Sequence, residues 1–304
     1  MAPPTRNTRP GTAAQKKRRA RPVPLKKVLA CPNNRLNVDY PLVVSVSGLK
    51  GGIGKSTSAM FIAFVFWAVY GKKVAVVDAD PTSQTCWTWW YEAIQNNKQD
   101  RELAARGEIA EKDIREPLPF EVKSMANDLV GTQVRAMLDE DPSIEVVVID
   151  CGGDSDSITA SAAKISDICV VVTTPEKADG KRLPASAQVI AQANPDAVLK
   201  ILFCKVWRAR QAFNLDRMRQ IDTKLRWAEF RLRAYASLRP RSYSADEVVG
   251  GLPLTLDEYP AIVTELLRAH DPDAVPDDPE PDPADVMAEI DDDPDDADEL
   301  EEEA

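Results

Sequence analysis

The chain of 304 residues has one histidine and only five cysteines. Because that histidine, His270, stands alone near the end of the apolar part of the chain, histidine acid–base catalysis is disfavoured. The cysteines form no CxxC pair and no paired spacing, which argues against a disulfide framework, a zinc site and an iron–sulfur cluster. This cysteine usage fits a reducing cytoplasm.

Long apolar runs are also missing. The most apolar stretch, residues 59–70, has about twelve residues, whereas a helix needs roughly 20 to cross a bilayer. No apolar segment follows the basic N-terminal residues, so a signal peptide is not expected. The acidic C-terminus would be repelled by anionic lipid, so no membrane partner is expected either.

The two ends of the chain carry opposite charge. Residues 1–27 hold nine Lys or Arg and no acid, and residues 271–304 hold eighteen Asp or Glu and no base. Removing these from the totals of 38 basic and 49 acidic residues leaves 29 and 31, so the acidic balance belongs to the tail. We expect a disordered basic arm over 1–40, one folded domain over 41–270 and a disordered acidic tail over 271–304.

Between these ends, short apolar runs rich in β-branched residues alternate with segments suited to helices. The predicted strands lie in residues 41–48, 72–80, 144–153, 167–175 and 199–207, with weaker candidates at 119–124 and 230–238. The predicted helices lie in residues 56–70, 127–138, 158–164 and 182–192. Continuous hydrophobicity is typical of strands buried on both faces, so we predict an α/β fold with a doubly wound, mostly parallel sheet covered by helices.

The stretch SGLKGGIGKST, residues 47–57, follows the first predicted strand and opens the first predicted helix. Glycines allow backbone N–H groups to surround phosphate oxygens, Lys55 can reach the β- and γ-phosphates, and the Ser56 hydroxyl can ligate Mg²⁺. The sequence therefore predicts an ATP·Mg²⁺ site. The residues expected to bind the nucleotide in this loop are Lys50, Gly51, Gly52, Ile53, Gly54, Lys55, Ser56 and Thr57.

A second lysine, Lys50, stands where an ordinary phosphate loop does not need one, and Leu49 replaces the usual glycine. The resulting pattern, KGGxGK[ST], resembles the deviant Walker A loop of the ParA/MinD group of P-loop ATPases. The resemblance implies that Lys50 reaches the nucleotide of a second subunit across an ATP-containing homodimer. The alternative is a solvated loop lysine.

Three later segments resemble the same family. VVDADPTSQ resembles its DxDP motif, which implies that Asp80 positions the attacking water and Mg²⁺, although Thr82 replaces the usual glutamine; the alternative is that Asp80 caps the next helix. VVVIDCGGDSD resembles Walker B and implies a role for Asp150 at the metal. The segment around Pro175 resembles the adenine-facing segment. The order of these motifs looks most like ParF-type plasmid partition ATPases.

Partition ATPases also hold DNA without sequence preference, which requires clustered Lys and Arg. Residues 200–241 contain twelve of these against three acids, and four of them recur every seven residues. The alternative is a solvated amphipathic face. The candidate DNA contacts are Arg208, Arg210, Arg217, Arg219, Lys224, Arg231 and Arg241.

Two smaller features have structural interpretations. The aromatic cluster Trp87, Trp89, Trp90 and Tyr91 is expected to pack in the core, with a partner or dimer contact as the alternative. Cys151, which follows the Walker B aspartate, is expected to be a small buried residue.

Together these resemblances predict a slow, partner-stimulated ATPase whose ATP-bound dimer binds DNA and segregates a plasmid or chromosome. The expected partner is a ParB-like centromere-binding protein, and the expected location is the nucleoid in the cytoplasm. One alternative is a related ATPase that positions a protein assembly or serves conjugation. Another is a small-molecule ligase on the same fold, of the dethiobiotin-synthetase kind, which would need a substrate pocket.

Overall fold

The structure, a computed structural model, describes residues 36, 38, 41–48, 50–153, 155–174, 177–204, 230–231 and 259–275. Their centre is a seven-stranded sheet with the order β3-β2-β4-β1-β5-β6-β7, in which all the strand pairs are parallel. The strands are β1 (Leu42–Ser47), β2 (Val74–Ala79), β3 (Glu121–Ser124), β4 (Val146–Cys151), β5 (Ile168–Thr173), β6 (Val198–Phe203) and β7 (Phe230–Arg231). The predicted α/β fold with a parallel sheet is confirmed.

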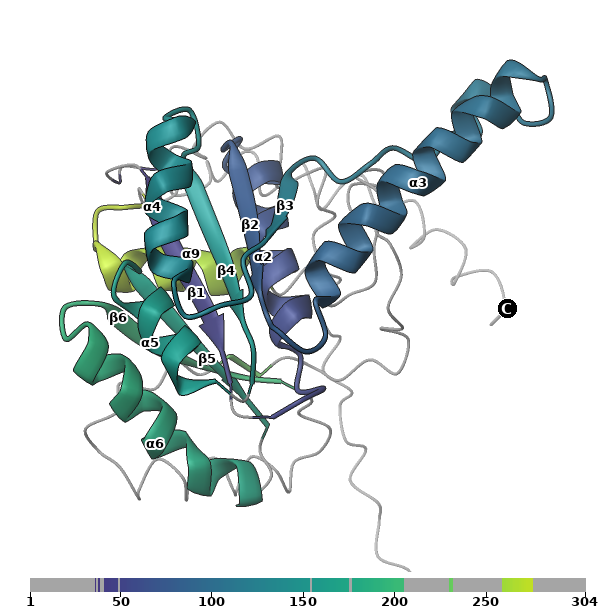
Figure 1. Cartoon of the computed structure of the whole chain (residues 1–304). Helices are drawn as coiled ribbons and strands as arrows, with labels where there is room; N and C mark the ends of the chain where they lie inside the picture. Colours follow the sequence, from purple (N-terminus) through teal and green to yellow (C-terminus); the bar gives the residue numbers. More distant parts are fainter. Residues whose placement is uncertain are drawn as a thin grey trace, which may run out of the picture.

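Helices cover both faces of this sheet (Figure 1). They are α2 (Lys55–Ala68), α3 (Thr85–Ala105), α4 (Val130–Glu140), α5 (Asp156–Ala163), α6 (Lys177–Ala193) and α9 (Tyr259–His270), with a 3-10 turn η1 (Glu111–Asp113) after α3. One core cluster joins α2, the start of α3 and α9 to one face. Two further clusters join α4, α5 and α6 to the other face.

Helix α2 is buried almost all round, which explains its continuous apolar sequence. Phe61, Phe64 and Phe66 are each at most 1% exposed, and the Phe64 ring meets Phe120 edge to face at 4.9 Å between centroids. On another side of α2, Tyr259 of α9 donates a hydrogen bond to Ser58 Oγ at 3.0 Å. The helix that follows the glycine-rich loop is therefore packed between the sheet and the neighbouring helices.

Helix α3 was not among the predicted helices, and it differs from the others. It has 21 residues, of which only Cys86, Trp89, Ala93 and Asp100 are buried. Figure 1 shows its C-terminal half extending away from the sheet. The segment that leads from η1 to β3 contacts this half of the helix through Arg115. Its Nε and Nη2 donate to the two carboxylate oxygens of Asp100 at 2.7 and 2.9 Å.

Other expectations differ from the structure in extent or lie outside it. Helix α6 begins at Lys177, five residues before its predicted start at residue 182, and the predicted strand at 230–238 is described only at Phe230–Arg231. The arm and tail expected at the two ends lie almost wholly outside the described residues. Among the helices that the structure describes, none is both long and apolar enough to span a bilayer.

Candidate nucleotide-binding site

The glycine-rich loop joins the central strand β1 to α2 at the carboxyl edge of the sheet, where α/β folds bind ligands. Gly52 and Gly54 have φ of 72° and 110°, which an L-residue with a Cβ rarely adopts. Helix α2 has no side-chain cap at its N-terminus and no acid in its first turn. Its first N–H groups and the positive end of its dipole thus suit a phosphate group.

Lys55 is the first residue of α2 and is only 7% exposed. Its Nζ donates to the Lys50 carbonyl oxygen at 3.1 Å, which holds the ammonium group beneath the loop. Gly153 lies against it, because a Cβ at that position would be 3.1 Å from Lys55 Nζ and from the Gly48 carbonyl oxygen. The glycine pair after β4 therefore closes one side of the loop, and Lys50 itself is exposed.

Two aspartates lie beside each other below the loop. Asp78 of β2 and Asp150 of β4 are partners in the parallel register, and both are 0% exposed. Their side chains continue the rows formed by Val76 and Val148, which face α2. Register and alternation thus bring the two carboxylates to the same face of the sheet at its carboxyl edge.

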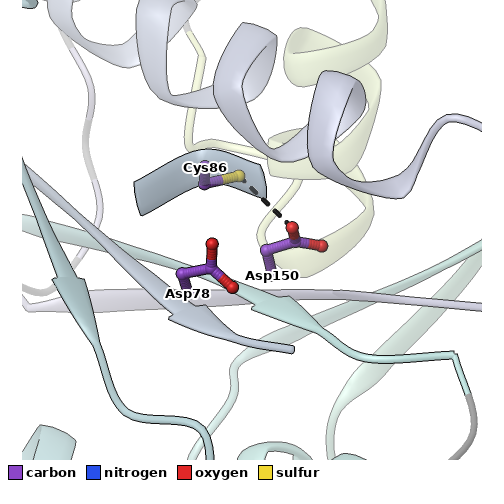
Figure 2. Close-up of side chains that lie close together, drawn as sticks. All are labelled: Asp78, Cys86 and Asp150. Carbon is purple, nitrogen blue, oxygen red and sulfur yellow. Dashed lines mark hydrogen bonds between the residues drawn. The ribbon is translucent and has the colours of Figure 1, made fainter. Parts of the chain in front are cut away.

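A thiol completes this group, as Figure 2 shows. Cys86, in the first turn of α3, donates from Sγ to Asp150 Oδ2 at 3.2 Å, and its sulfur lies 3.6 Å from the Ser56 carbonyl oxygen. Asp78 positions this turn, because its Oδ2 accepts a hydrogen bond from the Trp87 amide at 2.9 Å. Asp78 therefore acts as a cap for α3, which has no side-chain cap of its own.

The buried carboxylates lack sufficient positive charge around them. Burial, and then the charge of Asp78, raises the pKa of Asp150 to about 7, against hydrogen bonds from Ser56 and Cys86 and the charge of Lys55. Burial also raises the pKa of Asp78, although amide donors oppose it. Asp150 Oδ1 is buried and has no hydrogen-bond partner. A divalent cation beside Asp150 and Ser56 would supply the missing positive charge, and the unpartnered oxygen of Asp150 could coordinate it. These residues therefore fit Mg²⁺.

Asp80 donates its amide to Asp78 Oδ1 at 3.1 Å, but its own carboxylate is held by other donors. Its Oδ1 accepts from the amides of Thr82 and Ser83 at 2.8 and 3.1 Å, and its Oδ2 accepts from Ser83 Oγ at 2.8 Å. Burial acts to raise the pKa of Asp80, but these hydrogen bonds and the charge of Lys55 lower it overall. Asp80 is thus an ionised carboxylate that organises the turn before α3, and its role toward water and metal stays a prediction.

The family model described as ATPase MipZ matches residues 42–227, which is well over half of the chain. The chain belongs to the MipZ ATPase family. It is therefore a member of the ParA/MinD superfamily of P-loop ATPases, as the loop pattern around Lys50 and Lys55 predicts. A comparison with curated protein sequences gives no significant match.

Solved structures with the same fold include partition and cell-division proteins. A putative plasmid partition protein from Borrelia burgdorferi B31 bound to AMPPNP is 17% identical, with a TM-score of 0.54 over 75% of this chain and 98% of that chain. An ATP complex of McdA from Cyanothece is 15% identical, with a TM-score of 0.53 over 76% and 97%. MinD in the MinC:MinD complex of Aquifex aeolicus is 12% identical, with a TM-score of 0.51 over 74% and 96%. At these identities the likeness is one of fold.

Several predicted site residues of this MipZ-family chain lie outside the described part. Pro175 is among them, and so are the candidate DNA contacts except Arg231, whose backbone forms part of β7. Lys200, in the same basic segment, is described and instead pairs with Glu265 of α9 at 3.6 Å. The predicted DNA-binding surface therefore stays a prediction.

The core packing predicted for the aromatic cluster holds for its tryptophans, and the alternative of a partner or dimer contact stays a prediction. Trp89 is 7% exposed in the core, and Trp87 and Trp90 pack partly against the same core cluster. Tyr91 is 46% exposed and stacks on Trp87, with 5.2 Å between ring centroids. The buried position predicted for Cys151 is confirmed at 0% exposure.

Sequence reasoning missed Cys86 as a member of the site. No metal-ligand spacing identifies it, because Asp150, which its thiol contacts, lies 64 residues later in the chain. The one local signal is that Cys86 lies six residues after Asp80, the second aspartate of the DxDP-like motif.

Proposed function

We propose that the chain is an ATPase of the ParA type that binds ATP·Mg²⁺, dimerises around the nucleotide and thereby controls attachment to DNA. One observation carries this proposal: three features lie together at the same edge of the sheet. They are the N-terminus of α2, which follows a glycine and has no side-chain cap, the buried Lys55, and the buried carboxylate of Asp150. The helix N-terminus and Lys55 suit a phosphate group, and the buried carboxylate of Asp150 suits a divalent cation. Nucleotides in two solved structures of the same fold support it.

Within one subunit, each residue has a separate task. The loop amides and Lys55 bind the phosphates, and the Ser56 hydroxyl and Asp150 hold Mg²⁺. When bound, Mg²⁺ compensates the charge that develops on the transferred phosphoryl group. Asp80 orients water through the carboxylate that the turn keeps ionised. Pro175 faces the adenine.

Between subunits, Lys50 acts on the nucleotide of the partner. Its position fits this role, since it is exposed on the loop while its own carbonyl oxygen is held by Lys55 Nζ. A lysine that acts only in the dimer links assembly to ATP, and hydrolysis then releases the two subunits. We infer that hydrolysis is slow until a partner protein, of the centromere-binding ParB-like kind, stimulates it.

The cargo is DNA that must be segregated, held through the basic residues of the segment 200–241. This places the protein on the nucleoid in the cytoplasm. Membership of the MipZ ATPase family supports a partition or positioning role over a small-molecule ligase. If the ATP-bound dimer ignores DNA, a protein assembly becomes the cargo to test.

Nucleotide binding tests the site itself. Isothermal titration with ATP and Mg²⁺ compares the wild type with Lys55→Ala and with Lys98→Ala, an exposed lysine of α3 that serves as the control. A charge-assisted hydrogen bond contributes roughly 1.5–3 kcal/mol, so Lys55→Ala should weaken ATP binding about 10- to 100-fold. Unchanged affinity in Lys55→Ala would contradict the assignment, whereas Lys98→Ala should bind as the wild type does.

A further inference from the structure

Among the described residues, one group offers three metal-ligating atoms close together: Asp78, Cys86 and Asp150. The three atoms lie within 4.8 Å of one another, and all three residues are fully buried. They come from the end of β2, the first turn of α3 and the end of β4. Figure 2 shows the Cys86 sulfur directed at the Asp150 carboxylate, with the Asp78 carboxylate close beside them.

The bonding capacity of this group is not used up. Asp150 Oδ1 is buried without a hydrogen-bond partner. Asp78 accepts amide hydrogen bonds from Asp80 at 3.1 Å and from Trp87 at 2.9 Å, and the Cys86 amide also bonds to it, so its carboxylate is held in place beside the thiol. A buried carboxylate oxygen without a partner is costly, and either Mg²⁺ or a cation held beside the thiol would satisfy it.

We propose that Cys86, Asp78 and Asp150 form a binding site for a thiophilic divalent cation of the Zn²⁺ class. The inference rests on the proposed function in one respect, since Asp150 is also assigned to Mg²⁺. The two cations then compete: a zinc-class ion held by the thiolate occupies the Asp150 carboxylate and displaces Mg²⁺.

The spacing suits such an ion. In a tetrahedral site with Zn–S near 2.3 Å and Zn–O near 2.0 Å, neighbouring ligand atoms are about 3.3–3.5 Å apart. Cys86 Sγ and Asp150 Oδ2 are 3.2 Å apart, which is already close to that spacing. The other pairs of ligand atoms are at most 4.8 Å apart, so they would have to approach by up to about 1.5 Å, and water or a nucleotide phosphate oxygen would take the fourth position.

The thiol determines which cation is preferred. Mg²⁺ takes six oxygen ligands and gains nothing from sulfur, whereas zinc-class ions bind thiolate and carboxylate together. On binding, the S–H bond of Cys86 breaks, a sulfur–metal bond forms and the proton leaves to solvent. No electron is transferred, so no oxidant or reductant is required.

Cobalt(II) is the probe, because tetrahedral thiolate-bound Co²⁺ gives a visible ligand-field spectrum and a near-ultraviolet sulfur-to-cobalt charge-transfer band. The full chain is titrated with Co²⁺ in buffer without nucleotide or Mg²⁺, and a phosphine reductant keeps the cysteines reduced. The variants are Cys86→Ser, a control at another buried thiol, Cys169→Ser, and a control at Cys31→Ser. Circular dichroism establishes that each variant is folded.

We expect the wild type, Cys169→Ser and Cys31→Ser to bind one Co²⁺ with the charge-transfer band, and Zn²⁺ to displace it. Cys86→Ser should lose the band, and its Zn²⁺ affinity should fall by more than the roughly 10- to 100-fold that loss of an outer-shell partner costs. Asp78→Asn should keep the band and bind Zn²⁺ more weakly. Absence of the band in the wild type, or its persistence in Cys86→Ser, overturns the proposal whatever the folding of the variants.

This outcome is separate from that of the proposed function. If the wild type shows no thiolate band but still binds ATP·Mg²⁺ and dimerises, only the zinc-class site is wrong. If it shows the band but does not bind ATP·Mg²⁺, the ATPase proposal fails and the metal site stands. Where both hold, Mg²⁺ should compete with Co²⁺ for the wild type, and the competition should strengthen when ATP is present.

Discussion

Because Asp78 and Asp150 are buried side by side, we expect the stability of the protein to depend on pH in an unusual way, and Asp150→Asn should remove this dependence. In the nucleotide-free protein the pKa of Asp150 is raised from its ordinary value near 3.8 to about 7, first by burial and then by Asp78. An acid whose pKa is higher in the folded state binds more protons there than in the unfolded chain. The free energy of unfolding of the wild type should therefore fall as pH rises between about 4 and 7 and level off above that range.

The size of this effect follows from the shift. At 1.36 kcal/mol for each pKa unit, a change from 3.8 to about 7 corresponds to about 4 kcal/mol. Asp78 and Asp150 titrate as a pair, so the fall in the free energy of unfolding belongs to both carboxylates together. The other groups that face the Asp150 carboxylate are Lys55, Ser56 and Cys86. Asp150→Asn cannot ionise, and it should thus become more stable than the wild type at neutral and alkaline pH.

The assay is urea denaturation without nucleotide and with a chelator, at a series of pH values across this window. Asp139→Asn, at an exposed position of α4, is the matched control and should follow the wild type. The difference in unfolding free energy between Asp150→Asn and the wild type should grow with pH by up to about 4 kcal/mol. A difference that does not change with pH, or one that shrinks as pH rises, would refute the reasoning.

Three stability predictions concern the scaffold around the site, each measured by denaturation against the wild type. Phe64→Ala removes a ring that is 0% exposed and should cost about 3–5 kcal/mol; a cost under about 1 kcal/mol would mean that α2 is not packed as described. Gly131→Ala places a Cβ 2.5 Å from the Ser161 carbonyl oxygen and should cost about 1–3 kcal/mol through the forced shift of α4 from α5, so an unchanged midpoint would contradict that contact. Tyr259→Phe deletes the buried hydrogen bond to Ser58 and should cost about 0.5–1.5 kcal/mol, and a fully neutral change would show that α9 is held by packing alone.

Much of the fold could be predicted because its central strands are buried on both faces. The runs that became β1, β2, β4 and β5 are buried throughout and mostly apolar, a pattern typical of parallel strands covered by helices. The loop before α2 was equally predictable, since glycines with positive φ and a lysine at a helix start are local requirements. The buried strands and the glycine-rich loop depend on residues that are neighbours in the chain, so the sequence pattern is enough to predict them.

The long α3 and the thiol beside Asp150 were harder to predict. Helix α3 buries only four of its 21 residues, so its sequence shows little apolar periodicity. Cys86 gains its neighbours from the parallel register of β2 and β4, in which Asp78 and Asp150 are partners. Such contacts depend on strand order, which the local pattern does not contain.

The most direct test of the central claim is sedimentation of the wild type beside Lys50→Ala in ATP and Mg²⁺, with and without duplex DNA, using Lys98→Ala as the charge-matched control. The account predicts that the wild type and Lys98→Ala dimerise and bind DNA only with ATP, while Lys50→Ala binds ATP but stays monomeric. If Lys50→Ala dimerises and binds DNA as the wild type does, Lys50 is a solvated loop lysine and the switch across the dimer is wrong.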